Sequence, residues 1–368
     1  MKLTFEKSNL INAINIVSKA VSSKSTLPIL ECILIDASTD EIKMIANDLE
    51  LGIETKVAGT ITERGKTAVP SKLFGEIIRK LPDSDVEIST DSANNMMIVC
   101  ENANFKIPAN PADEFSYLPY IEKDKYICLS QFTLKELIRQ TIFSISANDN
   151  NKLMTGELFE INENMLRVVS LDGHRISIRK IKLNDSYEKK NVVVPGKTLN
   201  EISRILTGDN EKEVFLFFGE NNIMFEFDDT KVVSRLIEGE YFNIDRMLSS
   251  DYTTKISLNK KRLLDCIERS MLLIRENDRK PIIMNITDDM ALSMNSTFGT
   301  MNERIEIEKE GKDIMIGFNP KFFVDALKVI DDEEVTLYLI NSKAPCFIRD
   351  DNEEYVYLIL PVNFNNVG

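Results

Sequence analysis

A segment of about twelve residues that occurs three times is the feature that most constrains how this chain can fold. Each copy begins with proline, reaches a lysine one or two residues later, and carries an acid followed three residues on by a base. The three copies occupy residues 70–81, 195–206 and 320–330. Their lysines, Lys72, Lys197 and Lys321, are 125 and 124 residues apart. A constant period of the size of a small domain predicts a triplicated chain.

Each copy has the pattern of a short amphipathic helix, with an apolar column (Phe74, Leu199, Phe323) opposite the charged positions. A longer helical pattern opens each third, and short runs of alternating β-type residues follow both helices. The longer patterns cover residues 5–21, 129–145 and 258–274. We therefore predict an α+β fold of three tandem similar domains, each with two helices and antiparallel strands. The predicted domains are residues 1–124, 125–252 and 253–368.

The composition indicates a folded protein of a reducing compartment. Apolar residues make up 43% of the chain, no run of about 18 apolar residues occurs, and the first residues lack the apolar core of a secretory signal. The five cysteines are odd in number and widely scattered: Cys32, Cys100, Cys128, Cys266 and Cys346. Such spacing favours core residues over disulfides or a zinc site. We expect a cytoplasmic protein without a metal or cofactor.

The net charge of −14 argues against a nucleic-acid binder, but its distribution does not. The six predicted helices together carry +8, so the rest of the chain carries −22. One explanation is that lysine and arginine favour helices while acids favour turns. The other is a basic helical surface that contacts phosphates without sequence preference. The sequence leaves both open.

Three stretches carry a resemblance to a known family. These stretches are Leu27-Pro28-Ile29-Leu30, residues 166–176 (which include Asp172-Gly173-His174-Arg175) and residues 358–362. Together with the three lysine helices, they resemble the bacterial DNA polymerase III beta subunits, the replicative sliding clamps. The resemblance implies a head-to-tail homodimer that closes a six-domain ring around duplex DNA, with helices inside and sheets outside. It implies a non-catalytic processivity factor that is associated with the nucleoid when loaded.

The resemblance also implies a hydrophobic peptide-binding cleft between the second and third domains. Through this cleft the replicative polymerase alpha subunit, the clamp loader, repair polymerases and mismatch-repair proteins would bind, each by a Gln-Leu-x-Leu-Phe-like motif. The implied lining is Met154, Leu171, Gly173, His174, Arg175, Ile176, Phe242, Arg246, Met247, Leu358, Leu360 and Pro361. Methionine and aliphatic walls accept leucine and phenylalanine anchors. Arg175 and Arg246 would bind the polar end of the motif.

The chain departs from the family pattern at the rim of this cleft. Tyr241-Phe242-Asn243-Ile244 stands where many members have Phe-Pro-Asp-Tyr, and Asn363 replaces a familiar arginine. These changes bear on peptide preference. Two alternatives remain: a clamp paralogue specialised for repair, and a cytosolic enzyme or small-ligand protein that uses the turn around His174, the only histidine. The enzyme alternative lacks a nucleophile motif near His174.

Two further sets of residues follow from the resemblance and the internal repeat. The candidate DNA-binding residues are Lys24, Lys72, Arg79, Asn148, Lys197, Arg204 and Lys321. The candidate residues of the dimer interface are Phe105, Ile107, Leu273 and Ile274. Ordinary surface exposure or core packing is the alternative for each of them.

Overall fold

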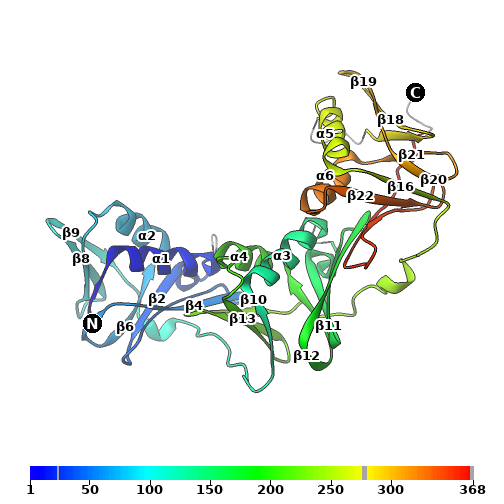
Figure 1. Cartoon of the computed structure of the whole chain (residues 1–368). Helices are drawn as coiled ribbons and strands as arrows, with labels where there is room; N and C mark the ends of the chain where they lie inside the picture. Colours follow the sequence, from blue (N-terminus) through cyan, green and yellow to red (C-terminus); the bar gives the residue numbers. More distant parts are fainter. Residues whose placement is uncertain (23–24, 149, 276–279, 365–368) are drawn as a thin grey trace. The chain divides into compact units, whose positions relative to one another are not determined.

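The computed structural model describes residues 1–368 except 23–24, 149, 276–279 and 365–368. It divides into two compact units, shown in Figure 1. Unit 1 comprises Met1–Lys135 and Lys197–Leu236, and unit 2 comprises Glu136–Gly196 and Ile237–Gly368.

Six α-helices lie in the described part of the chain, two in each third, as the repeat predicts. They are α1 (Lys7–Val17), α2 (Ser71–Lys80), α3 (Gln131–Thr141), α4 (Gly196–Ile205), α5 (Lys260–Met271) and α6 (Pro320–Val329). The first helix of each third begins two residues later than predicted. A strand precedes it in every case: β1 (Lys2–Phe5), β10 (Tyr126–Ser130) and β16 (Thr254–Asn259).

Local sequence explains where the helices start and which face they bury. Pro320 occupies the first position of α6, and the side chain of Asn319 accepts a hydrogen bond from the backbone N–H of Lys321 at 3.1 Å. The apolar column of the repeat is fully buried, since Phe74, Leu199 and Phe323 are each 0% exposed. The helices are therefore amphipathic in the predicted sense.

Unit 1 contains two antiparallel sheets. The larger has the order β10-β13-β14-β15-β4-β3-β2-β6, and the smaller β5-β1-β7-β8-β9. The larger is formed by β10 with β13 (Glu213–Phe218), β14 (Asn222–Phe227), β15 (Thr230–Arg235), β4 (Leu51–Val57), β3 (Ile42–Asn47), β2 (Cys32–Ala37) and β6 (Gly65–Pro70). The smaller adds β5 (Thr60–Glu63), β7 (Val86–Thr90), β8 (Asn95–Cys100) and β9 (Ala103–Pro108) to β1. Strands β15 and β4 pair between Thr230↔Thr55 and Ser234↔Leu51, so one sheet runs from the first third into the second.

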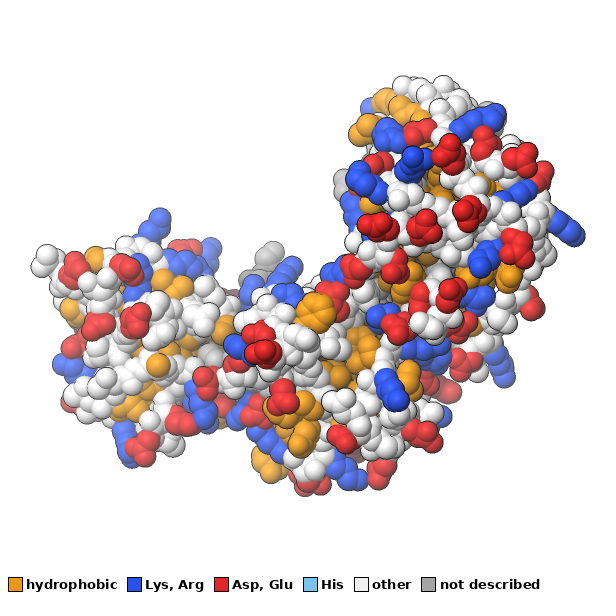
Figure 2. Space-filling view, in the orientation of Figure 1, with side chains coloured by type: hydrophobic (Ala, Val, Ile, Leu, Met, Phe, Trp, Pro, Cys, Tyr) orange, Lys and Arg blue, Asp and Glu red, His pale blue; other side chains and the backbone are white. Residues whose placement is uncertain are grey.

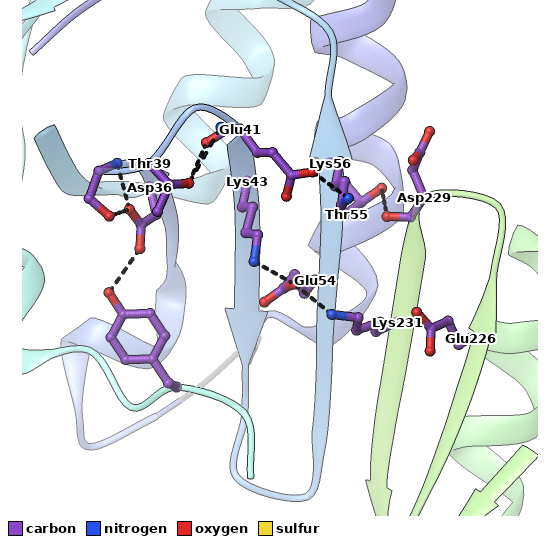
Figure 3. A network of polar contacts seen from close by, with 12 residues as sticks. Asp36, Thr39, Glu41, Lys43, Glu54, Thr55, Lys56, Glu226, Asp229 and Lys231 are labelled. Atoms are coloured by element: carbon purple, nitrogen blue, oxygen red, sulfur yellow. Dashed lines mark hydrogen bonds and ion pairs between the residues drawn. The ribbon is translucent and has the colours of Figure 1, made fainter. Parts of the chain in front are cut away.

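The larger sheet of unit 1 has its helices on one side, where α1 contacts both α2 and β4 (Figure 1). Its strands also carry matched charges. Figure 3 shows Glu54 of β4 between Lys43 of β3, at 3.4 Å, and Lys231 of β15, at 3.3 Å. Lys56 of β4 pairs with Glu41 at 2.6 Å. The lysines drawn on these strands are thus neutralised by nearby acids.

Unit 2 also contains two antiparallel sheets, of order β11-β12-β24-β23-β22-β16-β20 and β19-β18-β17-β21. The first is formed by β16 with β11 (Gly156–Leu171), β12 (Arg175–Pro195), β24 (Tyr355–Ile359), β23 (Cys346–Arg349), β22 (Glu334–Leu339) and β20 (Glu308–Gly311). The second contains β17 (Ile282–Ile286), β18 (Met290–Ser296), β19 (Gly299–Ile305) and β21 (Ile314–Phe318). Strand β12 pairs with β24 in the register Ile176↔Leu358. This pairing joins the second third of the chain to the last.

The predicted α+β fold with antiparallel strands is confirmed. Within the described residues, no helix has both the length and the apolar character needed to cross a membrane.

Candidate functional site

An apolar cavity of about 390 Å³ lies at one end of the β12–β24 pair, entirely within unit 2. It is lined by Met154, Leu171, Gly173, His174, Arg175, Ile176, Phe242, Met247, Pro345, Leu358 and Leu360. Leu360 is 37% exposed and Met247 44% exposed, so apolar side chains remain accessible to a ligand. A cavity with such walls suits aliphatic and aromatic anchors of a peptide.

The cavity contains ten of the twelve residues that the sequence predicted for the cleft. Arg246 and Pro361 do not line it, although Arg246 is exposed in the adjacent 3₁₀ turn Ile244–Arg246. Pro345 lines the cavity and was not predicted. It follows a turn in which Asn341 accepts hydrogen bonds from the backbone of Lys343 and Ala344. That turn has a recognisable Asx pattern, but nothing in the sequence connects it with the cleft.

One wall of the cavity is the tight turn between β11 and β12. Asp172 accepts hydrogen bonds from the backbone N–H groups of His174, at 2.9 Å, and Arg175, at 3.1 Å. Gly173 has φ +87°, a left-handed conformation that favours glycine. The carbonyl of His174 accepts a hydrogen bond from the N–H of Leu360 at 2.9 Å. The turn and the end of the last strand are therefore held together as one wall.

Two short 3₁₀ turns with side-chain caps carry or adjoin further lining residues. Asn151 accepts a hydrogen bond from the N–H of Leu153 at 3.1 Å and caps the turn that carries Met154. Asn243 accepts one from the N–H of Arg246 at 3.4 Å and caps the turn next to Phe242. Asparagine at this departure from the family pattern still satisfies the backbone of the rim.

Arg175 has other partners than those we predicted. Its side chain is 9% exposed, and it donates to Asp172 at 3.0 Å, to Asp325 at 2.7 Å and to the carbonyl of Phe143 at 2.5 Å. The guanidinium also lies 4.6 Å from the ring centroid of Phe322. Since these contacts occupy it, the more exposed Arg246 is the better candidate for the polar end of a peptide.

The surroundings of His174 do not form a catalytic arrangement. The carboxylate of Asp172 is engaged by backbone N–H groups and by Arg175, and the histidine ring faces Phe322 with centroids 6.1 Å apart. A general base needs an orienting acid and a nucleophile within hydrogen-bond reach. Among the described residues, no group of three or more potential ligands could hold a metal ion.

Five of the seven candidate DNA-binding residues occupy the exposed sides of helices α2, α4 and α6. Lys72 and Lys321 are exposed in the first turns of α2 and α6, and neither forms an ion pair with another described residue. Three others have partners: Lys197 pairs with Asp48 at 2.5 Å, Arg204 pairs with Glu201 at 2.7 Å, and Arg79 donates a hydrogen bond to Asn15 at 3.1 Å. Asn148 is exposed in a loop, and Lys24 lies outside the described residues. In Figure 2, basic side chains project from the side of unit 1 where α1, α2 and α4 lie.

The candidate interface residues differ in exposure. Phe105 is 39% exposed on β9, the edge strand of its sheet, whereas Ile107 is 6% exposed. Leu273 and Ile274 are half-buried against the core of their own unit. The neighbouring Leu272 is 82% exposed, and we did not predict it. The helical pattern over residues 258–274 did not single it out, because Leu272 lies off the apolar stripe that Leu263, Ile267 and Met271 form.

Helices over antiparallel sheets, repeated three times with an apolar cleft beside the β12–β24 pair, define a protein of the DNA-clamp class. Comparison with known proteins agrees. Family models for the N-terminal, central and C-terminal domains of the DNA polymerase III beta subunit match residues 1–119, 128–243 and 245–363.

Individual relatives match over nearly their whole length. The beta sliding clamp of Staphylococcus aureus is 34% identical over 375 residues, which covers 98% of this chain and 99% of the relative. A crystal structure of a putative DNA polymerase III beta subunit from Eubacterium rectale is 64% identical, with a TM-score of 0.97 over 99% of this chain and 100% of that one. The sliding clamp of Bacillus subtilis is 34% identical, with a TM-score of 0.96 over 99% of each chain.

This chain belongs to the bacterial DNA polymerase III beta subunit family, the sliding clamps. The resemblance found in the sequence is confirmed, and so is the arrangement as three tandem clamp domains. Membership also confirms the prediction of a processivity factor that is not itself an enzyme.

Proposed function

We propose that this protein encircles duplex DNA as a homodimeric ring and tethers the replicative polymerase through the apolar cleft of unit 2. The clamp loader, repair polymerases and mismatch-repair proteins would use the same cleft through Gln-Leu-x-Leu-Phe-like motifs. The supporting observation is that ten residues predicted for the cleft from four separate parts of the chain line one accessible apolar cavity. A closed ring needs only weak phosphate contacts, because its topology retains it on the duplex. The protein would act in the cytoplasm, on the nucleoid.

The proposal includes the predicted domain limits, 1–124, 125–252 and 253–368. The second of these domains is divided between the two compact units. Its strands β10, β13, β14 and β15 join the large sheet of unit 1, and β11 and β12 join that of unit 2. Sheet continuity between consecutive domains suits a rigid ring wall, since backbone pairing continues from one domain into the next.

Calorimetric titration with a Gln-Leu-x-Leu-Phe peptide tests the cleft. We expect binding near micromolar, about −8 kcal/mol. Met154→Asp/Leu360→Asp is expected to abolish it, because two charges would enter an apolar cavity. The matched control is Leu49→Asp/Met315→Asp, which makes the same kinds of change at positions 54% and 47% exposed that do not line the cavity. No binding by the folded wild-type protein, or equal binding by the cleft variant, would contradict the proposal.

The salt dependence of binding to a short DNA duplex tests the helical face. Each phosphate contact contributes about 0.9 to the slope of log K against log salt. Lys72→Ala/Lys321→Ala is expected to lower that slope by nearly 2 for each protomer of the ring and to leave peptide binding unchanged. Lys231→Ala is the control, because Lys231 lies on a strand and pairs with Glu54. An unchanged slope in the double variant, or an equal loss per lysine in the control, would rule out these helices as the DNA-facing surface.

A further inference from the structure

The acidic position of the repeated helices has a different partner in the third copy. Glu201 of α4 pairs with Arg204 of its own helix at 2.7 Å and with Lys19 at 3.7 Å. The matching Asp325 of α6 pairs with Arg175 at 2.7 Å, although 150 residues separate the two in the chain. In the third copy, the acidic side chain thus contacts Arg175, at the end of the turn that forms one wall of the cleft.

Arg175 connects three separate segments of unit 2. Its Nε bonds to Asp172 in the cleft turn, one terminal nitrogen bonds to Asp325 in α6, and the other bonds to the carbonyl of Phe143 in the 3₁₀ turn Ile142–Ser144. The guanidinium also lies 4.6 Å from the ring centroid of Phe322 in α6 and 5.4 Å from that of Phe143. A planar fork with two carboxylates, a carbonyl and two rings around it has little freedom to move.

The contacts continue from this junction to the cleft wall. Asp172, which accepts from Arg175, also accepts from the backbone N–H groups of His174 and Arg175 and so fixes the turn. The carbonyl of His174 in turn receives the N–H of Leu360. Asp325 itself is absent from the cavity lining, so its effect on a peptide would be transmitted through Arg175 and Asp172.

We propose that Asp325 is a positioning residue of the cleft, which holds the 172–175 turn in its peptide-binding shape through Arg175. The inference rests on the proposed peptide-binding function. It makes α6, the helix that carries the exposed Lys321, a structural support of the cleft. A preorganised wall binds more tightly because less ordering remains to be done when the peptide arrives.

Two measurements on Asp325→Asn test this role. Peptide affinity is expected to fall about tenfold, mostly through faster dissociation. In the absence of peptide, hydrogen exchange of the amides of His174 and Arg175 is expected to accelerate, because both N–H groups depend on Asp172. Asp325→Glu, which keeps the charge, is expected to recover most of the affinity. The matched control is Glu201→Gln, which changes the same column in α4 and should alter neither quantity.

A double-mutant cycle separates positioning from general loss of stability. If Asp325 acts through Arg175, then Arg175→Met/Asp325→Asn should bind peptide no more weakly than Arg175→Met alone, because methionine leaves no charge to pair with Asp325. Additive losses, or wild-type affinity in Asp325→Asn, would overturn the inference. If the wild-type protein binds no peptide, the proposed function fails instead, and the exchange rates still decide whether Asp325 holds the turn. Unchanged exchange in Asp325→Asn would then overturn the inference independently.

Discussion

Glu157→Gln is expected to stabilise unit 2, by an amount that increases with pH. Glu157 lies in β11 and is 0% exposed, and neither carboxylate oxygen has a hydrogen-bond partner among the described residues. The hydroxyl of the nearby Thr141 donates its proton to the carbonyl of Leu137 at 2.6 Å and not to the carboxylate. Burial raises the pKa of this carboxyl well above its ordinary value of 4.5. The folded protein therefore keeps the proton at pH values where the unfolded chain has released it. Stability is lost as the pH rises from 4.5 towards the folded pKa, at about 1.4 kcal/mol per pH unit.

The glutamine variant lacks this titration, so its advantage over the wild type should be small near pH 4.5 and grow above it. Glu157→Met, which removes the buried polar atoms at similar volume, should show the same pH trend. Glu163→Gln is the matched control, because Glu163 lies exposed on the same strand. Calorimetric unfolding between pH 5 and pH 8 provides the measurement. A difference between Glu157→Gln and the wild type that stays constant over this range would show that Glu157 is ionised in the folded protein.

The helices could be predicted from the sequence because their signal is local and repeated. An apolar stripe such as Leu10, Ile14 and Val17 specifies a buried face whatever packs against it, and all three are at most 2% exposed. The helix starts were less accurate. Phe5, Leu129 and Leu258 lie at or next to the last residues of β1, β10 and β16, directly before the helices. A single apolar residue at such a junction has no period of its own, and strand pairing with distant residues decides its conformation.

Irregularities of the strands could not be predicted from the sequence and are visible only in the structure. Residues 158–161 and 166–170 have the alternating pattern of two short strands, but they form parts of one strand, β11. Its pairing with β12 shifts register around Glu163, which has φ +53°. Polar residues at this shift interrupt the alternation and resemble a turn. Ile29 and Leu30 belong to an apolar run typical of a strand, but residues 28–31 form a 3₁₀ turn that begins at Pro28.

The cleft illustrates which part of a site a sequence can reveal. Family resemblance predicted most of its lining, because the stretches around His174 and Leu360 carry the motifs. The partners of Arg175 depend on a contact with Asp325, 150 residues away, and no local pattern encodes that pairing. An arginine beside an apolar cleft was therefore predicted as a ligand contact, whereas its observed contacts lie within the protein.

Phe323→Ala is expected to destabilise unit 2 by about 3–5 kcal/mol, the usual cost of removing a buried aromatic ring. Phe323 is fully buried in α6, and its ring packs edge-on against Phe318 with centroids 4.9 Å apart. The cavity left behind cannot close easily, because both rings belong to one continuous core cluster with Leu327 and Tyr357. Calorimetry should show the unfolding transition of this unit about 10 °C lower.

Lys321→Ala, two residues away on the exposed face of the same helix, is expected to change stability by less than about 0.5 kcal/mol. The two variants, Phe323→Ala and Lys321→Ala, distinguish the buried face of α6 from its exposed face by their different effects on stability and DNA binding. The phenylalanine change should lower the Tm and leave the number of phosphate contacts in the folded protein unaltered. The lysine change should lower the salt dependence of DNA binding and leave the Tm unaltered. If Lys321→Ala lowered the Tm as far as Phe323→Ala, the lysine column would belong to the core, and neither the repeat nor the burial pattern could then support a DNA-facing role.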